Sequence, residues 1–218
     1  MRGKSRRMMP PTNTRSPLTS NSADRTLADL KAGNIRFREG RSTAKHWQVS
    51  ESVRPQNPKA IILSCSDARV PAEIIFDQGP GDLFAIRVAG NIAASSQIAS
   101  IEFAATQFGT PLVIVLGHTG CGAITATLRA LNHKESPLPG HISEIVDHIA
   151  PNIASLVGPN PIEITEVLAD QCMQANIRAS IDQLQQTSEP LSELTKSDDL
   201  TICGAFYDLS TGEVSFID

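Results

Sequence analysis

Three short aliphatic segments, each bounded by residues that interrupt regular structure, constrain the fold of this 218-residue chain most strongly. They cover residues 60–63, 83–88 and 111–117. Apolar runs of this length are typical of strands that are buried on both faces. Helical periodicity follows over 95–108, between the second and third runs, and over 123–131, after the third. Strands that alternate with helices predict an α/β fold, in which a mostly parallel central sheet is flanked by helices.

The segments outside this region complete the prediction. Apolar residues at helical spacing over 24–39 predict an N-terminal helical arm. Residues 138–158 are mostly helix-like, and residues 161–184 predict a long helix with Pro161 near its start. Segments 200–208 and 213–217, joined across a turn, predict a hairpin. The hairpin would give the sheet a C-terminal antiparallel edge strand.

The N-terminal residues differ in composition from the rest. Residues 1–22 carry basic side chains and no acidic ones, and they are rich in Ser, Thr, Asn and Pro. We expect a flexible basic arm at 1–22 and a single α/β domain at 23–218. A targeting segment is the alternative for this arm, but the apolar core of a secretory signal is missing. A cytoplasmic location is therefore expected, and it would keep the thiols reduced.

Composition excludes several classes of function. The net charge is −4 and only 4% of the residues are aromatic. The chain therefore lacks both the positive electrostatic field and the stacking aromatic side chains that nucleic-acid binding needs. No apolar run approaches the roughly 20 residues that span a bilayer. Four cysteines without a CxxC pair are too few for a disulfide scaffold in a chain of this length.

Residues with metal-binding and acid–base chemistry follow two of the predicted strands. Cys65, Asp67 and Arg69 come directly after the first strand, and His118 and Cys121 come after the third. The carboxyl ends of parallel strands lie along one edge of a sheet, so these residues are expected to meet there. The glycines around His118 and Cys121 permit a tight turn that lets both side chains face one ion.

Two cysteines and one histidine form a donor set that suits Zn²⁺ better than hard cations. A fourth position closed by protein would make the site structural, whereas a water there would make it catalytic. Asp67 is close enough in sequence to reach the metal or its water, and Arg69 is placed to hold that carboxylate.

The other cysteines and histidines have simpler interpretations. Cys172 and Cys203 lack neighbours at ligand spacing, so we expect them to be core thiols. Three other histidines are His133, His141 and His148. They could form a second metal site, but a plain surface location is favoured for each of them.

Residues 65–71 and 118–122 together resemble the signature of the β-class carbonic anhydrases. The similarity extends over about 29–208 and includes the segments 33–37, 81–84 and 87–91. The resemblance implies an enzyme with one Zn²⁺ per chain, which uses zinc-bound hydroxide to convert carbon dioxide reversibly to bicarbonate and a proton. The implied ligands are Cys65, His118 and Cys121, and the implied catalytic residues are Asp67 and Arg69. The family fold also implies a homodimer or homotetramer with the active site at the dimer interface.

Subtype features follow from the same resemblance. Gln78 and Gly122 match substrate-binding positions, and the glutamine belongs to the subtype without bicarbonate gating. Arg87 and Tyr207 match the bicarbonate pocket of the other subtype, but Ile62 stands where that pocket has tryptophan. We therefore expect an open, water-bearing site, with Asp67 becoming a fourth zinc ligand only in a closed state.

Two thiolates cancel the formal charge of Zn²⁺, so its water should ionise less readily than at a three-histidine site, and activity should favour neutral to alkaline pH. Other functions remain compatible with these motifs. The same zinc site would suit carbonyl sulfide or carbon disulfide hydrolysis, and a closed site would suit a non-catalytic zinc-binding protein. A nucleophilic-cysteine enzyme is less favoured, because it needs one activated thiolate and not a pair of cysteines around a histidine.

Overall fold

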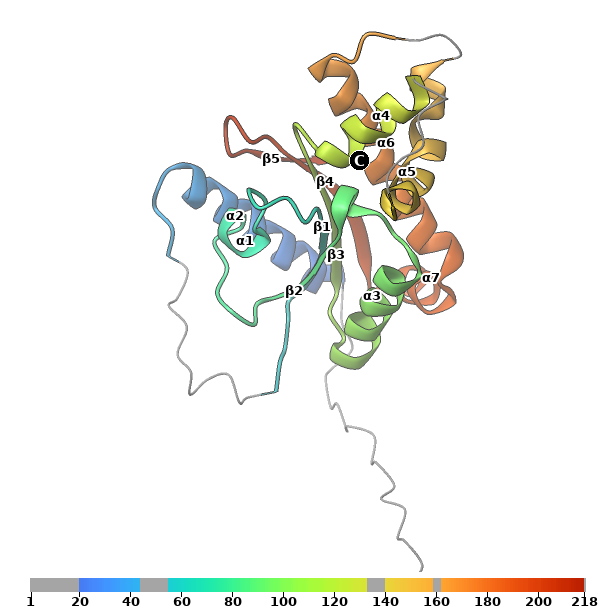
Figure 1. The fold of residues 1–218 in the computed structure, drawn as a ribbon. Coiled ribbons are helices and arrows are strands. Elements are labelled where there is room, and N and C mark those ends of the chain that lie inside the picture. The colour runs from blue at the N-terminus through green and yellow to red at the C-terminus, as the bar shows by residue number, and fades with distance from the viewer. Residues whose placement is uncertain (1–19, 44–54, 133–139, 159–161, 218) are drawn as a thin grey trace, which may run out of the picture.

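The computed structural model describes residues 20–43, 55–132, 140–158 and 162–217. Five strands form one sheet in the order β2-β1-β3-β4-β5 (Figure 1). Their bounds are Ala60–Ser64 for β1, Leu83–Arg87 for β2, Leu112–His118 for β3, Thr201–Tyr207 for β4 and Val214–Ile217 for β5. The first four are parallel and β5 is antiparallel to β4. The expected mostly parallel sheet with an antiparallel C-terminal edge is confirmed.

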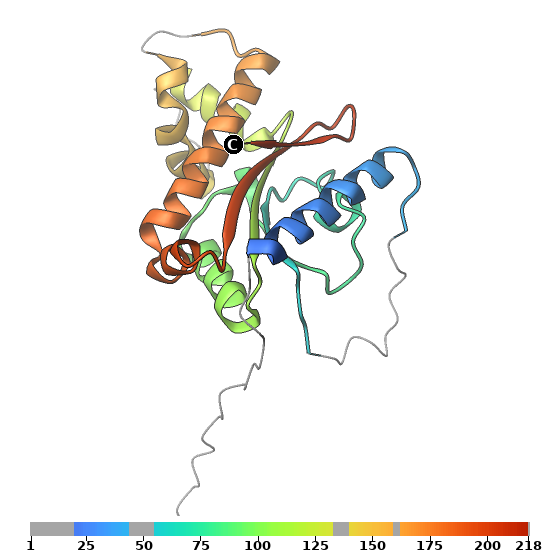
Figure 2. The same cartoon turned by 180° about the vertical axis from the view of Figure 1, so that it is seen from behind.

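Helices cover both faces of the sheet. Figure 1 and Figure 2 show α1 and the short α2 on one side, and α3 to α7 on the other. The bounds are Ser20–Arg38 for α1, Ala72–Ile75 for α2, Ser95–Phe108 for α3, Gly122–Asn132 for α4, Ile142–Val157 for α5, Glu166–Thr187 for α6 and Glu189–Lys196 for α7. A 3-10 turn, η2 (Ala89–Asn91), follows β2 after Val88.

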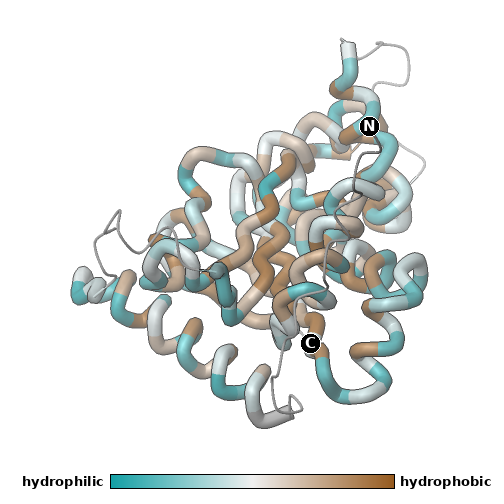
Figure 3. The backbone as a smooth tube through the Cα atoms, turned by 90° about the horizontal axis from the view of Figure 1, so that it is seen from below, coloured by the Kyte–Doolittle hydropathy of each residue, from teal (hydrophilic) through white to brown (hydrophobic). Residues whose placement is uncertain are grey.

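The central strands supply the core. Every residue of β1 and β3 is buried, as their aliphatic sequences predict. Alternate residues serve opposite faces because side chains alternate along a strand: Ile61 and Val113 pack with the α3–α7 layer, whereas Ile62 and Ile114 pack with α1 and α2. Figure 3 shows the most apolar segments gathered at the middle of the fold. The sheet edge that holds the motifs is therefore rigidly supported.

Two glycines bring α6 close to the sheet. A Cβ atom on Gly117 of β3 would lie 2.5 Å from Met173 Sδ, and one on Gly204 of β4 would lie 2.7 Å from Ile177 Cγ2. Neither strand position could therefore carry a side chain without moving the helix. This close packing sets α6 beside the carboxyl end of β3.

Some boundaries differ from those expected. The long helix begins at Glu166 and not at 161, because the Thr165 hydroxyl caps it by accepting a hydrogen bond from Leu168 N at 3.2 Å. Ser188 likewise caps α7, which was not anticipated. Helix α1 already begins at Ser20, and residues 1–19 of the expected basic arm lie outside the described residues. Among the described residues, no helix combines the length and apolar character needed to cross a membrane.

Candidate metal centre

The sheet topology brings the two motifs together. Strand β1 has β2 on one side and β3 on the other, so the chain changes direction between β1 and β3. Ligands of open parallel sheets bind beyond the carboxyl ends of the strands at such a point. Cys65 follows the last residue of β1, and His118 is the last residue of β3. Ser64 pairs with Leu116, which leaves Cys65 close to His118.

A short turn returns the chain to the same point. Gly120 has a φ of 64°, a left-handed conformation that glycine adopts at low cost, and Cys121 then precedes α4. Thr119 fastens the turn to the neighbouring strand: its N–H donates to Tyr207 O at 3.0 Å, and its Oγ1 accepts from Leu209 N at 3.0 Å. Cys121 is thereby held beside His118.

The three expected metal ligands form one buried cluster. Ligand atoms of Cys65, His118 and Cys121 all lie within 4.8 Å of one another. The Nδ1 atom of His118 lies 2.8 Å from Thr119 O and donates to that carbonyl, which leaves Nε2 with a free lone pair. Nε2 is buried and has no hydrogen-bond partner within the described part of the chain. A buried imidazole nitrogen without a partner, facing two thiols, fits a tetrahedral Zn²⁺ site.

The two thiols interact strongly with each other. A hydrogen bond from Cys121 lowers the pKa of Cys65 below its usual range, while the same bond, together with burial, raises the pKa of Cys121. A divalent cation would displace any thiol proton that remains on the pair, since thiolates and not thiols bind metals.

Asp67 and Arg69 form the expected pair next to this cluster. Asp67 Oδ1 accepts from Arg69 N and Arg69 Nε, both at 2.9 Å, and Asp67 Oδ2 accepts from Arg69 Nη2 at 2.7 Å. The hydrogen bond from the Arg69 side chain is the main reason that the pKa of Asp67 lies well below its ordinary value. The carboxylate is therefore ionised and bound to Arg69, and it is not a member of the metal-ligand cluster.

Arg87 holds the loop that carries Cys65 and Asp67. Its Nε donates to Cys65 O at 3.1 Å and its Nη2 donates to Asp67 O at 2.6 Å. The other two positions compared with the bicarbonate pocket are Tyr207 and Ile62. Tyr207 pairs with His118 across β3 and β4, and Ile62 is fully buried in the core beneath α1 and α2. Arg87 thus has carbonyl partners within its own chain.

The two expected substrate-binding residues occupy different surroundings. Gln78 is buried, and its Nε2 donates to Phe76 O at 2.8 Å within the same chain. Gly122 begins α4 next to Cys121, and a Cβ atom added to it would meet nothing within 4 Å. Gly122 therefore leaves open space beside one of the ligands.

The remaining cysteines and histidines lie apart from the metal-ligand cluster. Cys172 is fully buried in the core and Cys203 is partly buried in β4. His141 pairs with Glu144, and His148 is exposed. His133 lies outside the described residues. In the described part of the chain, no second group of these residue types forms a metal cluster.

Sequence reasoning missed the role of Gly90. Its backbone N–H donates to Cys65 Sγ at 3.4 Å. Gly90 has a φ of 70° inside η2, and the signal in the sequence was a glycine two residues after a predicted strand.

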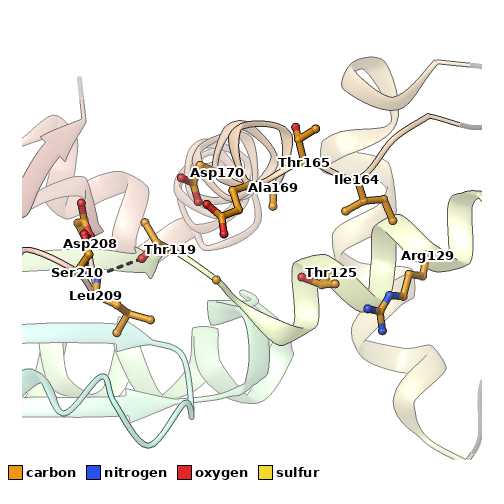
Figure 4. A pocket seen from close by; sticks show the side chains of 12 residues that line it. Thr119, Thr125, Arg129, Ile164, Thr165, Ala169, Asp170, Asp208, Leu209 and Ser210 are labelled. Carbon is orange, nitrogen blue, oxygen red and sulfur yellow. Dashed lines mark hydrogen bonds between the residues drawn. The ribbon is translucent and has the colours of Figure 1, made fainter.

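A cavity of about 560 Å³ borders the outer side of the metal-binding turn (Figure 4). Thr119 and Asp208 lie at one end and Arg129 at the other, with Asp170 of α6 between them. Burial, followed by the charges of Asp208 and Glu166, raises the pKa of Asp170. None of the three metal ligands lines this cavity.

Comparison with known proteins agrees with this geometry. The sequence profile of the carbonic anhydrase family matches residues 60–214. Carbonic anhydrase 2 of Mycobacterium tuberculosis (strain ATCC 25618 / H37Rv) is 38% identical over 186 residues, which cover 84% of this chain and 87% of the relative. A carbonic anhydrase of Mycolicibacterium smegmatis is 36% identical over 188 residues, which cover 85% and 88%.

Solved structures share the fold. The structure of the β-carbonic anhydrase CcaA has a TM-score of 0.67 and 27% identity, covering 88% of this chain and 95% of that one. One of two tetrameric β-carbonic anhydrases from Sordaria macrospora has a TM-score of 0.67 and 20% identity, covering 90% and 97%. Together with the profile match and the mycobacterial relatives, these structures show that the chain belongs to the β-class carbonic anhydrase family.

Proposed function

We propose that this protein interconverts carbon dioxide and bicarbonate, with one Zn²⁺ per chain held by Cys65, His118 and Cys121. The observation that carries the proposal is the convergence of three buried ligand atoms within 4.8 Å, one of them an imidazole nitrogen without a partner. When bound in such a site, Zn²⁺ acidifies a coordinated water and so supplies a nucleophile near neutral pH. The two thiolates offset the charge of the cation, so we expect activity to rise toward alkaline pH.

Asp67 is proposed to orient the reacting water. A carboxylate offers about four acceptor sites, and Arg69 uses three of them. The remaining site can accept a hydrogen bond from the nucleophile and direct its lone pair at the substrate carbon. Arg69 keeps this carboxylate ionised and away from the metal position, which favours an open site over a closed, non-catalytic one. Gly122 supports the proposal by leaving space for substrate beside Cys121.

We also propose that two chains associate through the face formed by α1 and α2. Ile35 of α1 is 49% exposed and Ile74 of α2 is 59% exposed, and the two helices contact each other. Large exposed apolar side chains on one face are typical of protein interfaces. Light scattering should give at least the mass of a dimer for the wild-type protein and a smaller mass for Ile74→Glu. A monomeric wild-type protein would refute this assembly.

The proposed activity is tested by comparing two cysteine variants of similar burial. Cys121→Ser should lose both bound zinc and carbon dioxide hydration, because serine is a poor zinc ligand. Cys172→Ser should keep both, since Cys172 lies in the core outside the ligand cluster. Zinc content and stopped-flow hydration rates are measured on the same preparations. Hydration by metal-free protein, or by Cys121→Ser at the wild-type rate, would contradict the proposal.

A further inference from the structure

A chain of hydrogen bonds runs from α5 through α6 to the sulfur of a metal ligand. Asn152 Nδ2 donates to Asn176 Oδ1 at 2.9 Å, and Asn176 Nδ2 donates to Gly90 O at 2.9 Å. Gly90 N in turn donates to Cys65 Sγ at 3.4 Å. The backbone of Gly90 thus connects the buried Asn176 with the metal centre.

The conformation of Gly90 makes this connection specific. Its φ of 70° lies in the left-handed region, and an added Cβ atom would lie 2.6 Å from Ile149 Cδ1 and 3.1 Å from Ala123 Cβ. Gly90 is therefore enclosed by α4 and α5, and its carbonyl is held by α6. The packing limits φ of Gly90, and Asn176 holds the Gly90 carbonyl. Together these two constraints set the direction of the Gly90 N–H.

Helix α6 holds this turn at two points. Ser180, one helical turn after Asn176, donates through its hydroxyl to Asn91 O at 3.4 Å. Residues four apart lie on the same helix face. Both side chains are buried, and they donate to the carbonyls of two consecutive residues of η2, Asn176 to Gly90 O and Ser180 to Asn91 O. The turn is therefore anchored to α6 through side chains, in addition to its apolar contacts.

Asn176 is an unexpected residue at its position. It is fully buried, next to Met173 and Ile177 on the apolar face of α6. Burying an amide brings no gain in apolar packing and costs free energy unless hydrogen bonds compensate. An apolar side chain would suffice if this position served packing alone. The two hydrogen bonds of Asn176 point to a role in orienting Gly90.

We propose that Asn176 is a positioning residue of the metal centre, which holds the Gly90 carbonyl so that the Gly90 N–H remains directed at Cys65 Sγ. This inference rests on the proposed function, because that function assigns Cys65 to zinc. Groups that hydrogen-bond to a metal ligand fix its orientation and tune its donor strength, and their loss typically lowers metal affinity or activity about 10–100-fold.

The test uses the full-length protein with Asn176→Leu, which keeps similar volume without the amide, and Asn176→Ala as a second, less bulky variant. The first readout is the rate of zinc release to an excess of chelator. The second is the thiolate-to-metal charge-transfer band of the Co²⁺-substituted protein. We expect either Asn176 variant to release zinc about 10–100-fold faster. The band should move to lower energy, because a thiolate without the N–H donor is more electron-rich.

Leu184→Ala is the matched control, since Leu184 is also fully buried on α6 and lies two turns further along. It should lower the melting temperature while leaving the zinc release rate and the cobalt band unchanged. Wild-type zinc release and an unshifted band in the folded Asn176 variants would overturn the inference, as would the same changes in Leu184→Ala. Absence of carbon dioxide hydration by wild-type protein would refute only the proposed function, because both readouts report the metal centre independently of substrate.

Discussion

Replacing Gly33 by alanine tests how closely α1 is docked on the loop after α2. A Cβ atom at this position would lie 1.8 Å from Phe76 O and 2.8 Å from Phe76 C. An ordinary contact begins at 3.4 Å, so the helix and the loop would have to separate by about 1.6 Å. The obstacle is backbone, which cannot rotate away as a side chain can.

This displacement would also strain the hydrogen bonds of the next residue. Asn34 Nδ2 donates to Ile75 O at 3.2 Å and to Gly212 O at 2.9 Å, and Asn34 Oδ1 accepts from Val214 N at 3.0 Å. Overpacking costs about 1–3 kcal/mol, and each weakened hydrogen bond adds about 1 kcal/mol. The higher helix propensity of alanine returns about 1 kcal/mol. With all three hydrogen bonds weakened, the net loss of stability is therefore about 3–5 kcal/mol.

Thermal unfolding at a fixed protein concentration measures this loss. For a chain of this length, about 3–5 kcal/mol corresponds to a decrease in melting temperature of roughly 6–20 °C. Gly122→Ala is the control, because its added methyl group would meet nothing within 4 Å. It should change the melting temperature by no more than about 2–4 °C, the equivalent of about 1 kcal/mol. A Gly33→Ala variant with wild-type stability would refute the close docking of α1.

Three further predictions concern the site and its surroundings. Arg69→Ala removes two of the three hydrogen bonds to Asp67, so stopped-flow hydration should fall by about 100-fold with zinc content unchanged; wild-type activity would count against the pair. Burial raises the pKa of Cys203 to about 11, so the unfolded chain loses this proton first and the free energy of unfolding should decrease as the pH rises from about 9 to 11. The free energies of unfolding of wild type and Cys203→Ala, measured by denaturant titration, should converge over this pH range. A constant difference between the two proteins would refute this effect. Removing zinc with a chelator should lower the melting temperature in calorimetry, because the metal binds only the folded ligand cluster; an unchanged value would contradict the proposed metal centre.

The sheet and its catalytic edge could be predicted because they depend on local sequence. The apolar runs of β1 and β3 are long enough to indicate burial on both faces, and residues at the carboxyl ends of parallel strands must lie along one edge. Cys65, His118 and Cys121 therefore meet as expected. The dyad of Asp67 and Arg69 was predictable because the two residues are neighbours in one loop.

Features that depend on contacts between distant segments could not be predicted. Gly33 of α1 packs on the Phe76 carbonyl after α2, but a glycine in a helical pattern does not indicate this partner. Asn176 is a single polar residue on the apolar face of α6, and only the folded structure shows that it holds Gly90. The start of α6 was misplaced because the Thr165 hydroxyl caps the helix by accepting from Leu168 N, so that the helix begins at Glu166.

Titration of metal-free protein with zinc, followed by stopped-flow hydration of carbon dioxide between pH 6.5 and 9, shows whether the bound metal is responsible for the reaction. Activity should rise in proportion to bound zinc up to one ion per chain, and the saturated rate should increase with pH. Full zinc occupancy without hydration of carbon dioxide at any pH in this range would contradict the proposed function. Carbonyl sulfide hydrolysis by that same zinc-loaded protein would then assign the site to the alternative substrate.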